Sequence, residues 1–377
     1  MAKKHKIAAL NSIFVTMNIL FLTYQGDMAG STNSIYYLAT GLAARGHSVY
    51  VGCRCRSLLF SMLSGTRAVA IPMEFRSKID RKCMQHICDI VRQYDIQIIN
   101  AQSSKDRYLS ILARWWYKLP VKLVHTRRQK AESIGGWLQN NFYVRGTDAI
   151  VTVSHQLKQD FVRRGFPSSH LHVILNGIDT KRFSEQTTAA KVANLRQKLD
   201  LLPTDIVVGC IARRKKQEQL LQALALLPPH IKVLFVGIEP HSLDETVKAL
   251  ALKNTIIYAG MVPSNEVLNY YALCSVNVLP STMDGFGLTL VEAMGMGVPV
   301  IGTRAQGIID VIGANEKNGL LFDDANVEQL AQKLNIALFD TERRQQLIAA
   351  GLKAAAEEFS VERTIAEYDH FFEKLIG

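Results

Sequence analysis

Short apolar runs rich in β-branched residues alternate with helical patterns along the whole of this 377-residue chain. Parallel strands are joined by crossovers that are usually helices, so this alternation predicts two α/β layers. The apolar fraction of 48% is ample for two cores, and the length suits two domains of ordinary size. The expected strands are residues 18–23, 48–52, 68–71, 96–100, 121–125, 149–153 and 172–175 in the first half, and 206–211, 231–236, 255–259, 276–279, 298–302 and 319–322 in the second.

The N-terminal segment resembles a secretory signal peptide, because three lysines precede an apolar stretch. However, residues 17–22 are also the first strand of a βαβ unit, followed by a helix at 34–44 and a strand at 48–52. Removing that first strand would destroy the unit, so we keep it in the folded protein. Residues 1–16 are then a poorly ordered extension, or synthesis begins at Met17. No uncharged apolar run elsewhere is long enough to span a membrane.

The division between domains is expected where the strands stop. Residues 184–203 are polar and then helical, with no strand, and we place the crossover between the domains there. This gives a first domain at 1–185, a second domain at 186–358 and a C-terminal amphipathic helix within 359–377. The six cysteines form no Cys-x-x-Cys pair and no Cys/His cluster, which favours reduced thiols in a cytosolic protein over disulfides or zinc.

Residues 276–303 carry the strongest functional signal. A buried strand is followed by a polar loop with Asp284, Gly285 and Gly287, and then by a helix. This order places free backbone N–H groups and the positive end of a helix dipole at one point, which suits a phosphate. The glycines allow a bulky ligand to approach the backbone. Asp284 and Glu292 frame the turn, and their carboxylates suit the hydroxyl groups of a ribose or a hexose.

This string resembles the acid-x7-acid signature of the retaining glycosyltransferases of family 4, which have the GT-B fold. The match continues in register through acid-Gly-Phe-Gly-Leu, Glu-Ala-Met and Gly-Val-Pro-Val-Ile. The first acid, usually Glu in the family, is Asp284 here and is one methylene shorter. The alternative is an ordinary βα turn whose acids face solvent. The resemblance implies two Rossmann-like domains facing each other across a cleft, with the C-terminal helix packing back on the first domain.

Family members neutralise the leaving diphosphate with cationic side chains and generally use no metal, and no Asp-x-Asp follows a strand here. We therefore expect no metal and no cofactor. Arg213 matches the arginine of the family pattern Gly-Arg, loop, Lys-Gly. The loop is shortened and Gln217 replaces the glycine, so the lysine is Lys215 or Lys216, and we prefer Lys216. A basic helix start facing solvent is disfavoured, because cations there oppose the helix dipole unless an anion binds.

The resemblance also implies the remaining contacts to the nucleotide-sugar donor. Asp284 would hold hydroxyls of the transferred sugar and Glu292 those of the ribose, and these two acids, Arg213 and Lys216 would be the catalytic residues. The other expected donor contacts, many through backbone groups, are Gly30, Gly237, Gly260, Met261, Val262, Gly285, Phe286, Gly287, Leu288, Thr289 and Leu290.

In a GT-B protein the first domain binds the acceptor. The expected acceptor-side residues are Ser31, Gln102, Lys105, Asp106 and Arg128. Gln102 and Arg128 stand where the family often has histidines.

The charge of the chain is divided unevenly. Residues 1–185 hold 26 Lys and Arg against 11 Asp and Glu, a net charge of +15, whereas the remaining residues hold 18 against 22, a net charge of −4. A basic first domain indicates an anionic acceptor or an anionic membrane surface, although plain solubility also explains it. The aromatic run at residues 115–117 could form an interfacial patch or could close a helix against the core.

The resemblance therefore implies a retaining glycosyltransferase that moves a hexose-type sugar to a lipid-linked or lipopolysaccharide glycan of the cell envelope. We expect a cytoplasmic protein resting on the inner face of the membrane. One alternative is a sugar-nucleotide 2-epimerase of the same fold. A basic nucleic-acid-binding protein is another, but we find no basic platform interleaved with aromatic residues and no known nucleic-acid motif.

Overall fold

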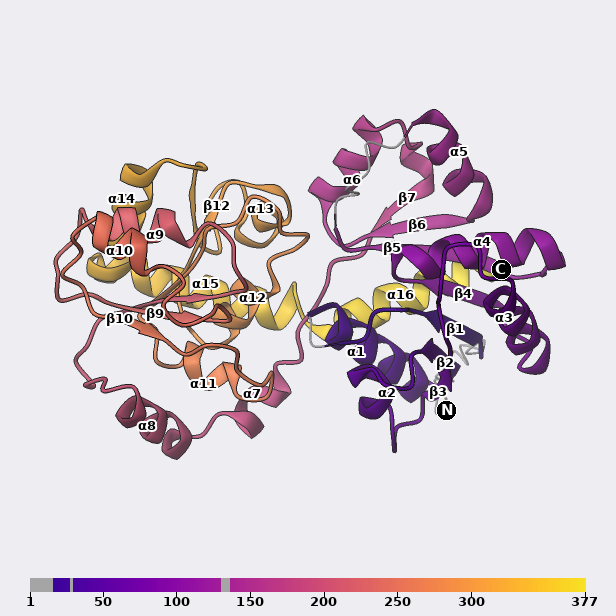
Figure 1. Ribbon diagram of the computed structural model, residues 1–377, viewed down its shortest axis with the longest axis horizontal. Helices are drawn as coiled ribbons and strands as arrows, with labels where there is room; N and C mark the ends of the chain where they lie inside the picture. The colour runs from indigo at the N-terminus through magenta and orange to yellow at the C-terminus, as the bar shows by residue number, and fades with distance from the viewer. Residues whose placement is uncertain (1–15, 28–29, 130–135) are drawn as a thin grey trace, which may run out of the picture.

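The computed structural model describes residues 16–27, 30–129 and 136–377, which form two α/β lobes side by side (Figure 1). Within these residues the first lobe has a seven-stranded parallel sheet of order β3-β2-β1-β4-β5-β6-β7. The second lobe has a six-stranded parallel sheet of order β10-β9-β8-β11-β12-β13. Both sheets have helices on their faces. The predicted fold class is confirmed.

All thirteen expected strands are present, each within a few residues of its predicted ends. The first sheet contains β1 (Asn18–Leu22), β2 (Ser48–Cys53), β3 (Val69–Pro72), β4 (Ile98–Ala101), β5 (Lys122–Arg127), β6 (Ala149–Thr152) and β7 (Leu171–Val173). The second contains β8 (Val207–Ile211), β9 (Lys232–Val236), β10 (Ile256–Tyr258), β11 (Val276–Leu279), β12 (Val300–Thr303) and β13 (Leu320–Phe322). The central strands are buried along their whole length because helices cover both sheet faces, which is why the sequence shows continuous apolar runs.

The helices connect the strands and cover the sheets. In the first lobe they are α1 (Gly30–Ala44), α2 (Leu58–Met62), α3 (Arg81–Gln93), α4 (Ser104–Tyr117), α5 (Trp137–Gly146) and α6 (His155–Arg163), with a 3-10 turn at Ser168–His170. The remainder are α7 (Lys181–Gln186), α8 (Ala189–Lys198), α9 (Gln217–Leu224), α10 (Asp244–Ala249), α11 (Val267–Tyr271), α12 (Leu288–Gly295), α13 (Gln306–Ile312), α14 (Val327–Phe339), α15 (Thr341–Glu357) and α16 (Val361–Ile376). Side chains that accept backbone N–H groups, such as Asp80 before α3 and Ser154 before α6, start several of them.

The chain crosses between the lobes twice, and the two crossings are hydrogen-bonded to each other. The Ile178 N–H donates to the Phe359 carbonyl at 2.8 Å, and the Val361 N–H donates to the Ile178 carbonyl at 2.9 Å. Gly177 allows this approach, because a Cβ there would lie 2.2 Å from the carbonyl oxygen of Ser360. The lobes are therefore joined by a short two-stranded connection rather than by one flexible linker.

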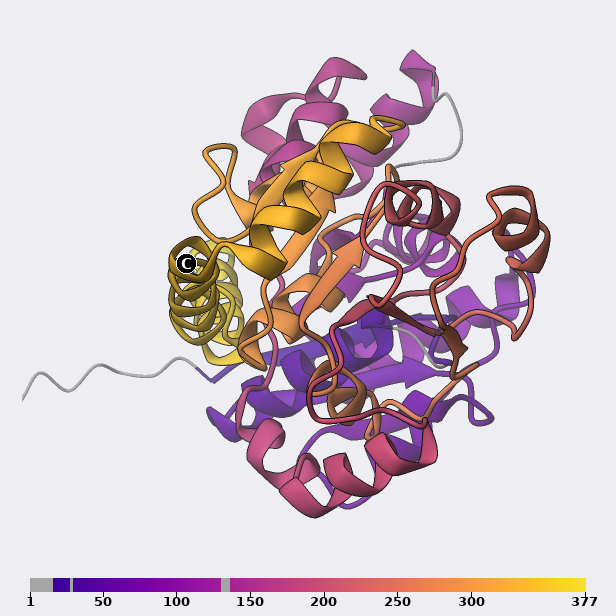
Figure 2. The same ribbon diagram turned by 90° about the vertical axis from the view of Figure 1, so that its left-hand side faces the viewer.

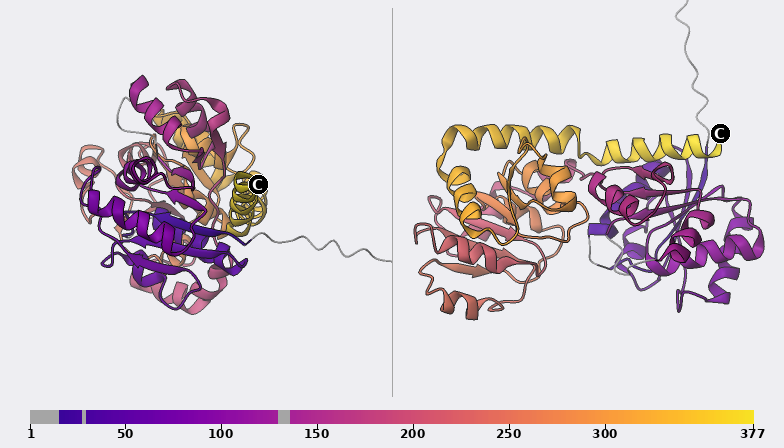
Figure 3. Two further views of the ribbon diagram at one scale, coloured as in Figure 1. Left: turned by 90° about the vertical axis from the view of Figure 1, so that its right-hand side faces the viewer. Right: turned by 90° about the horizontal axis from the view of Figure 1, so that it is seen from above.

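The C-terminal helix α16 leaves the second lobe and packs on α1 of the first, as predicted. The right-hand view of Figure 3 shows α15 and α16 one after the other along one side of the molecule, and in Figure 2 the two helices overlap at that side. The Asp369 carboxylate lies 2.7 Å from Nε2 of His47 and 2.8 Å from Nη1 of Arg45. Since Nδ1 of His47 accepts the Met17 N–H at 3.2 Å, its Nε2 carries the proton donated to Asp369. A buried polar contact thus fixes the position of α16.

The aromatic run at the end of α4 lies at the surface. Trp116 is 67% exposed, whereas the half-exposed Trp115 ring meets the Phe142 ring edge-on at 5.3 Å and Tyr117 packs against the core. The guanidinium of Arg81 lies 5.6 Å from the Trp116 ring centre. A role for this patch at a membrane surface stays a prediction. Among the residues that the structure describes, no helix has both the length and the apolar character needed to cross a membrane.

Phe372 of α16 is fully buried against the first lobe, whereas Phe339 of α14 is 45% exposed. We expect Phe372→Ala to lower the free energy of unfolding by about 3–5 kcal/mol, the usual loss for a buried Phe. Phe339→Ala makes the same chemical change at the surface and should cost less than about 1 kcal/mol. Urea denaturation of both variants measures the difference, and similar losses would contradict the docking of α16.

Candidate active site between the two lobes

The glycine loop between β11 and α12 is held by its own carboxylate. Oδ1 of Asp284 accepts the Gly287 N–H at 2.9 Å and the Phe286 N–H at 3.4 Å. Gly287 has φ +87°, a left-handed conformation that a side chain would strain, and it precedes the first residue of α12. The loop geometry thus uses one oxygen of Asp284 and leaves Oδ2 free to face a cation.

That cation is Lys215, which follows β8. Its Nζ lies 3.7 Å from Oδ2 of Asp284 and donates to the carbonyl of Met283 at 3.3 Å. The neighbouring Lys216 turns the other way and forms an ion pair with Asp324, whose pKa is lowered by this hydrogen bond. The structure therefore brings Lys215 to the glycine loop, whereas the sequence analysis preferred Lys216.

Gln217 explains why the loop after β8 can be short. Its Oε1 accepts the Lys215 N–H at 2.7 Å, and its Nε2 donates to the Arg213 carbonyl at 3.0 Å. The side chain is fully buried. An amide that bridges the two sides of the loop therefore stands where the family pattern has a glycine.

Glu292 of α12 lies opposite a cation that the sequence analysis missed. Its Oε1 pairs with Arg182 of α7, and its Oε2 accepts the Tyr271 hydroxyl at 3.3 Å. Burial raises the pKa of Tyr271 well above its ordinary value, and the nearby Glu292 charge adds to this. The phenol therefore stays protonated and keeps donating. No sequence signal pairs Arg182 with Glu292, although Arg182 lies three residues after the segment 176–179, which enters the connection between the lobes.

A cavity of about 220 Å³ opens between the lobes beside these groups. It is lined from the first lobe and the connection by Gly30, Asn33, Ser34, Tyr37, Leu58, Gly177, Ile178, Asp179 and Arg182, and from the second lobe by Arg213, Met261, Val262, Ser264, Val267, Leu288, Thr289 and Glu292. Seven of the predicted donor-side residues are in this lining. The hydroxyl of Thr289 is buried without a hydrogen-bond partner. Both lobes therefore contribute to one cavity at the start of α12.

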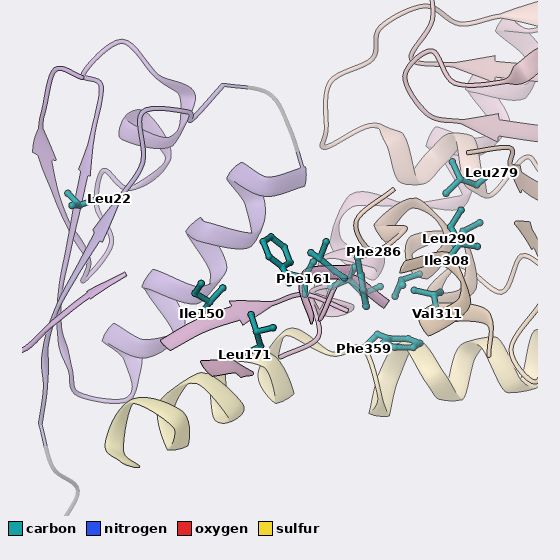
Figure 4. Packing of buried hydrophobic residues seen from close by; sticks show 14 of the residues in the cluster. Leu22, Ile150, Phe161, Leu171, Leu279, Phe286, Leu290, Ile308, Val311 and Phe359 are labelled. Atoms are coloured by element: carbon teal, nitrogen blue, oxygen red, sulfur yellow. The ribbon is translucent and has the colours of Figure 1, made fainter. Parts of the chain in front are cut away.

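Other predicted donor residues do not line this cavity. Gly237 (φ +92°) and Gly260 (φ +66°) form two adjoining turns, and the Gly237 N–H donates to the Gly260 carbonyl at 2.8 Å. Phe286 and Leu290 point into the core instead of the cavity (Figure 4). The Phe286 ring meets the Phe359 ring edge-on at 5.7 Å. Only their backbone groups could therefore take part in binding.

The lobes touch at the glycine loop. A Cβ on Gly285 would lie 1.7 Å from the carbonyl oxygen of Arg128 in the first lobe. Nearby, Asp310 of α13 reaches across to accept the N–H groups of His155 and Gln156, at 2.9 and 3.2 Å, at the start of α6. A carboxylate at the N-terminal end of a helix also complements its dipole. These contacts hold the lobes together in the arrangement shown.

Gly285→Ala tests this close approach. The added methyl group has no room unless the lobes separate, and misplacing reacting groups by ~1 Å can lower turnover by about 100-fold. Steady-state turnover and the radius of gyration from small-angle scattering measure the effect. The control is Gly136→Ala, where a Cβ would meet nothing within 4 Å. Normal turnover of Gly285→Ala would contradict a role for this lobe arrangement in catalysis.

A second cavity, of about 380 Å³, lies within the first lobe. Of the predicted acceptor-side residues, Ser31, Gln102 and Arg128 line it, and Arg128 donates to Oε1 of Gln102. Lys105 and Asp106 do not line it. Lys105 donates to the carbonyls of Phe75 and Arg76, while Asp106 accepts the N–H groups of Gln102 and Ser103 at 2.7 Å and closes the first turn of α4.

Sequence and structure comparisons point to one class of enzyme. The family model "Glycosyltransferase Family 4" matches residues 28–182, and the model "Glycosyl transferases group 1" matches residues 194–354. The crystal structure of a glycosyltransferase from Rickettsia africae ESF-5 superposes with a TM-score of 0.84 at 20% identity, and the match covers 96% of this chain and 99% of that one. The two family models give the class of enzyme, a glycosyltransferase, and the two Rossmann-like lobes give its GT-B fold.

Two curated relatives that are similar to this chain are also sugar transferases. Sulfoquinovosyl transferase SQD2 of Arabidopsis thaliana is 30% identical over 59% of this chain, although the match spans only 43% of that protein. The lipopolysaccharide core biosynthesis mannosyltransferase LpsB of Rhizobium meliloti (strain 1021) is 27% identical over 74% of this chain and 80% of its own length. The chain belongs to glycosyltransferase family 4, and is a retaining transferase that takes its sugar from a nucleotide-sugar.

Proposed function

We propose that this protein transfers a hexose from a nucleotide-sugar to a hydroxyl group of a lipid-linked or lipopolysaccharide glycan of the cell envelope. The first domain (1–185) would bind the acceptor and the second (186–358) the donor, with 359–377 as a brace between them. The observation that carries the proposal is the cavity between the lobes, where Arg213, Thr289 and Glu292 line one wall.

Arg213 and Lys215 would neutralise the donor diphosphate. Arg213 lines the cavity, and Lys215 reaches the glycine loop, where its nearest carboxylate is 3.7 Å away. A loosely paired cation of this kind can turn to a phosphate without leaving a buried charge behind. The backbone N–H groups at the start of α12 and the Thr289 hydroxyl would add hydrogen bonds to the same phosphates. In this arrangement cationic side chains supply the electrostatic stabilisation of the leaving group.

Asp284 and Glu292 would hold hydroxyl groups of the donor. Oδ2 of Asp284 faces Lys215 and would accept hydroxyl groups of the transferred hexose. Glu292 lines the cavity and would accept those of the ribose. Arg182 and Tyr271 fix the Glu292 carboxylate before the donor arrives, which reduces the cost of ordering it on binding.

The reaction would retain the anomeric configuration by attack on the same face as departure. The bond between the anomeric carbon and the phosphate oxygen breaks, and a bond from that carbon to the acceptor oxygen forms. The acceptor proton passes to the departing phosphate oxygen. The groups that bind the diphosphate are then the catalytic apparatus, since they stabilise the charge that develops on it.

The basic first domain supports an anionic acceptor and a location on the inner face of the cell membrane, because anionic lipids attract basic surfaces. The similarity to a lipopolysaccharide core mannosyltransferase supports the same acceptor class.

A nucleotide panel tests the donor site. UDP, GDP, ADP and their common sugar conjugates are added to the full chain, with and without EDTA, and the Tm is measured. A ligand at a hundredfold excess over its Kd stabilises the native state by about 2.7 kcal/mol, so the matching nucleotide should raise the Tm. A rise for one nucleotide family that survives EDTA fits a metal-independent transferase. The absence of any rise would overturn the proposed donor site.

Lys215→Ala and Lys216→Ala form a matched pair of variants. Loss of an electrostatic donor to the leaving group should lower the turnover of Lys215→Ala, as of Arg213→Ala, by roughly 10²–10³. Lys216→Ala removes a partly exposed ion pair and should keep turnover within about tenfold, since such pairs contribute at most about 1 kcal/mol. Initial rates with a saturating donor separate the two, and the reverse ranking would assign the phosphate to Lys216.

A further inference from the structure

The cavity within the first lobe is lined by an excess of positive charge. Its lining includes Ser31, Lys78, Arg107, Arg127 and Arg128. Four of these side chains are cationic, and among the described residues the lining contains no Asp or Glu. The charges come from the segment before α3, from α4 and from the end of β5, so the tertiary structure gathers them.

The arginines of this cavity keep unused hydrogen-bonding capacity. Arg127 is 5% exposed, with its guanidinium 4.6 Å from the ring centre of Tyr143 and 5.3 Å from that of Phe161. The buried Nε atoms of Arg107, Arg127 and Arg128 have no hydrogen-bond partner. Burial, together with the charge of Arg127, lowers the pKa of Arg107 to about 9. Clustered buried cations are costly unless an anion compensates them.

The cavity adjoins the proposed donor site. Ser31 lines the basic cavity, whereas Gly30, the preceding residue of α1, lines the cavity between the lobes. The side chain of Arg128 lines the basic cavity while its carbonyl faces Gly285 of the glycine loop. A molecule held by an anionic group in the basic cavity would therefore extend toward the transferred sugar.

We propose that this basic cavity is a subsite for a phosphate ester group carried by the acceptor, with Arg107, Arg127 and Arg128 as its ligands and Lys78 at its mouth. The inference rests on the proposed function, since it assigns the acceptor to the first lobe. Guanidinium groups bind phosphate oxygens through paired N–H donors, and three of them match the several oxygens of one phosphate. Lys78 is exposed, with Nζ 4.8 Å from the Tyr108 ring centre, so it can turn toward the same anion.

Calorimetric titration of the full chain with inorganic phosphate tests the subsite. Hydrogen bonds between charged groups are stronger than neutral ones, so Arg107→Gln should raise the phosphate Kd by roughly tenfold or more. Lys78→Gln should raise it by several-fold. Arg92→Gln is the control. Arg92 is exposed near the far end of α3, about 16 Å along the helix from Arg81, and should leave the Kd unchanged.

Arg213→Gln distinguishes this subsite from the donor site, which also suits phosphate. Phosphate affinity that depends on Arg107 and Lys78 but not on Arg213 supports the proposal, even if no nucleotide binds and the donor assignment fails. Affinity that falls only in Arg213→Gln, or no phosphate binding at all, overturns it. Because Lys78 is exposed, its variant remains informative if Arg107→Gln does not fold.

The phosphate could belong to a soluble sugar phosphate or to a lipid headgroup, and two further titrations separate these sources. Binding of mannose 6-phosphate that weakens in Arg107→Gln assigns a soluble acceptor. Binding only to phosphatidylcholine vesicles that contain phosphatidic acid, with the same dependence on Arg107, assigns a lipid acceptor. Equal binding by wild type and Arg107→Gln in both titrations overturns the subsite.

Discussion

The short connection between the lobes is the constraint on which the rest of the site depends. Two backbone hydrogen bonds join Ile178 to Phe359 and Val361, so the outgoing and returning chains cross side by side. Gly177 is needed because a Cβ there would meet the backbone of Ser360. The connection limits how the lobes can move, and places Arg182, just beyond it, against Glu292 of α12. The cavity between the lobes therefore lies beside this connection, and Gly177, Ile178 and Asp179 line part of it.

The two carboxylates of the site are oriented by neighbouring groups of the protein. Asp284 uses one oxygen to shape the glycine loop and presents the other to Lys215, while Glu292 is held by Arg182 and Tyr271. Each carboxylate is thus oriented without a ligand, and the cation at the loop is paired only at 3.7 Å. Groups oriented in advance lose little freedom when a ligand binds, which supports the donor contacts that we propose for them.

The start of α1 separates two cavities of different character. Gly30 faces the cavity that both lobes share, and Ser31 faces the basic cavity of the first lobe. Part of the positive charge of the first half of the chain therefore lines a cavity instead of being spread over the surface. The two proposed ligand sites are neighbours, as a transfer between two substrates requires.

Much of the fold could be predicted from the sequence. The alternation of strands and helices predicted all thirteen strands, because burial on both sheet faces leaves continuous apolar runs. The packing of α16 on the first lobe was predicted from the resemblance to the family. The string around Asp284 and Glu292 likewise pointed to the family, because strand, glycine loop and helix form a local unit. Seven predicted donor residues line the cavity between the lobes, and three of them, Leu288, Thr289 and Glu292, belong to this unit.

Other features depended on contacts between distant segments. Lys215 and Lys216 are adjacent and alike in the sequence, and only the packing of Asp324 and Asp284 separates their directions. Arg182 meets Glu292 across 110 positions, and Arg107 and Arg127 meet because α4 lies beside β5. Local sequence determined the elements and the glycine loop, since these rely on neighbouring residues. Tertiary structure alone decided which cations face the cavities, since charge pairing depends on distance in space.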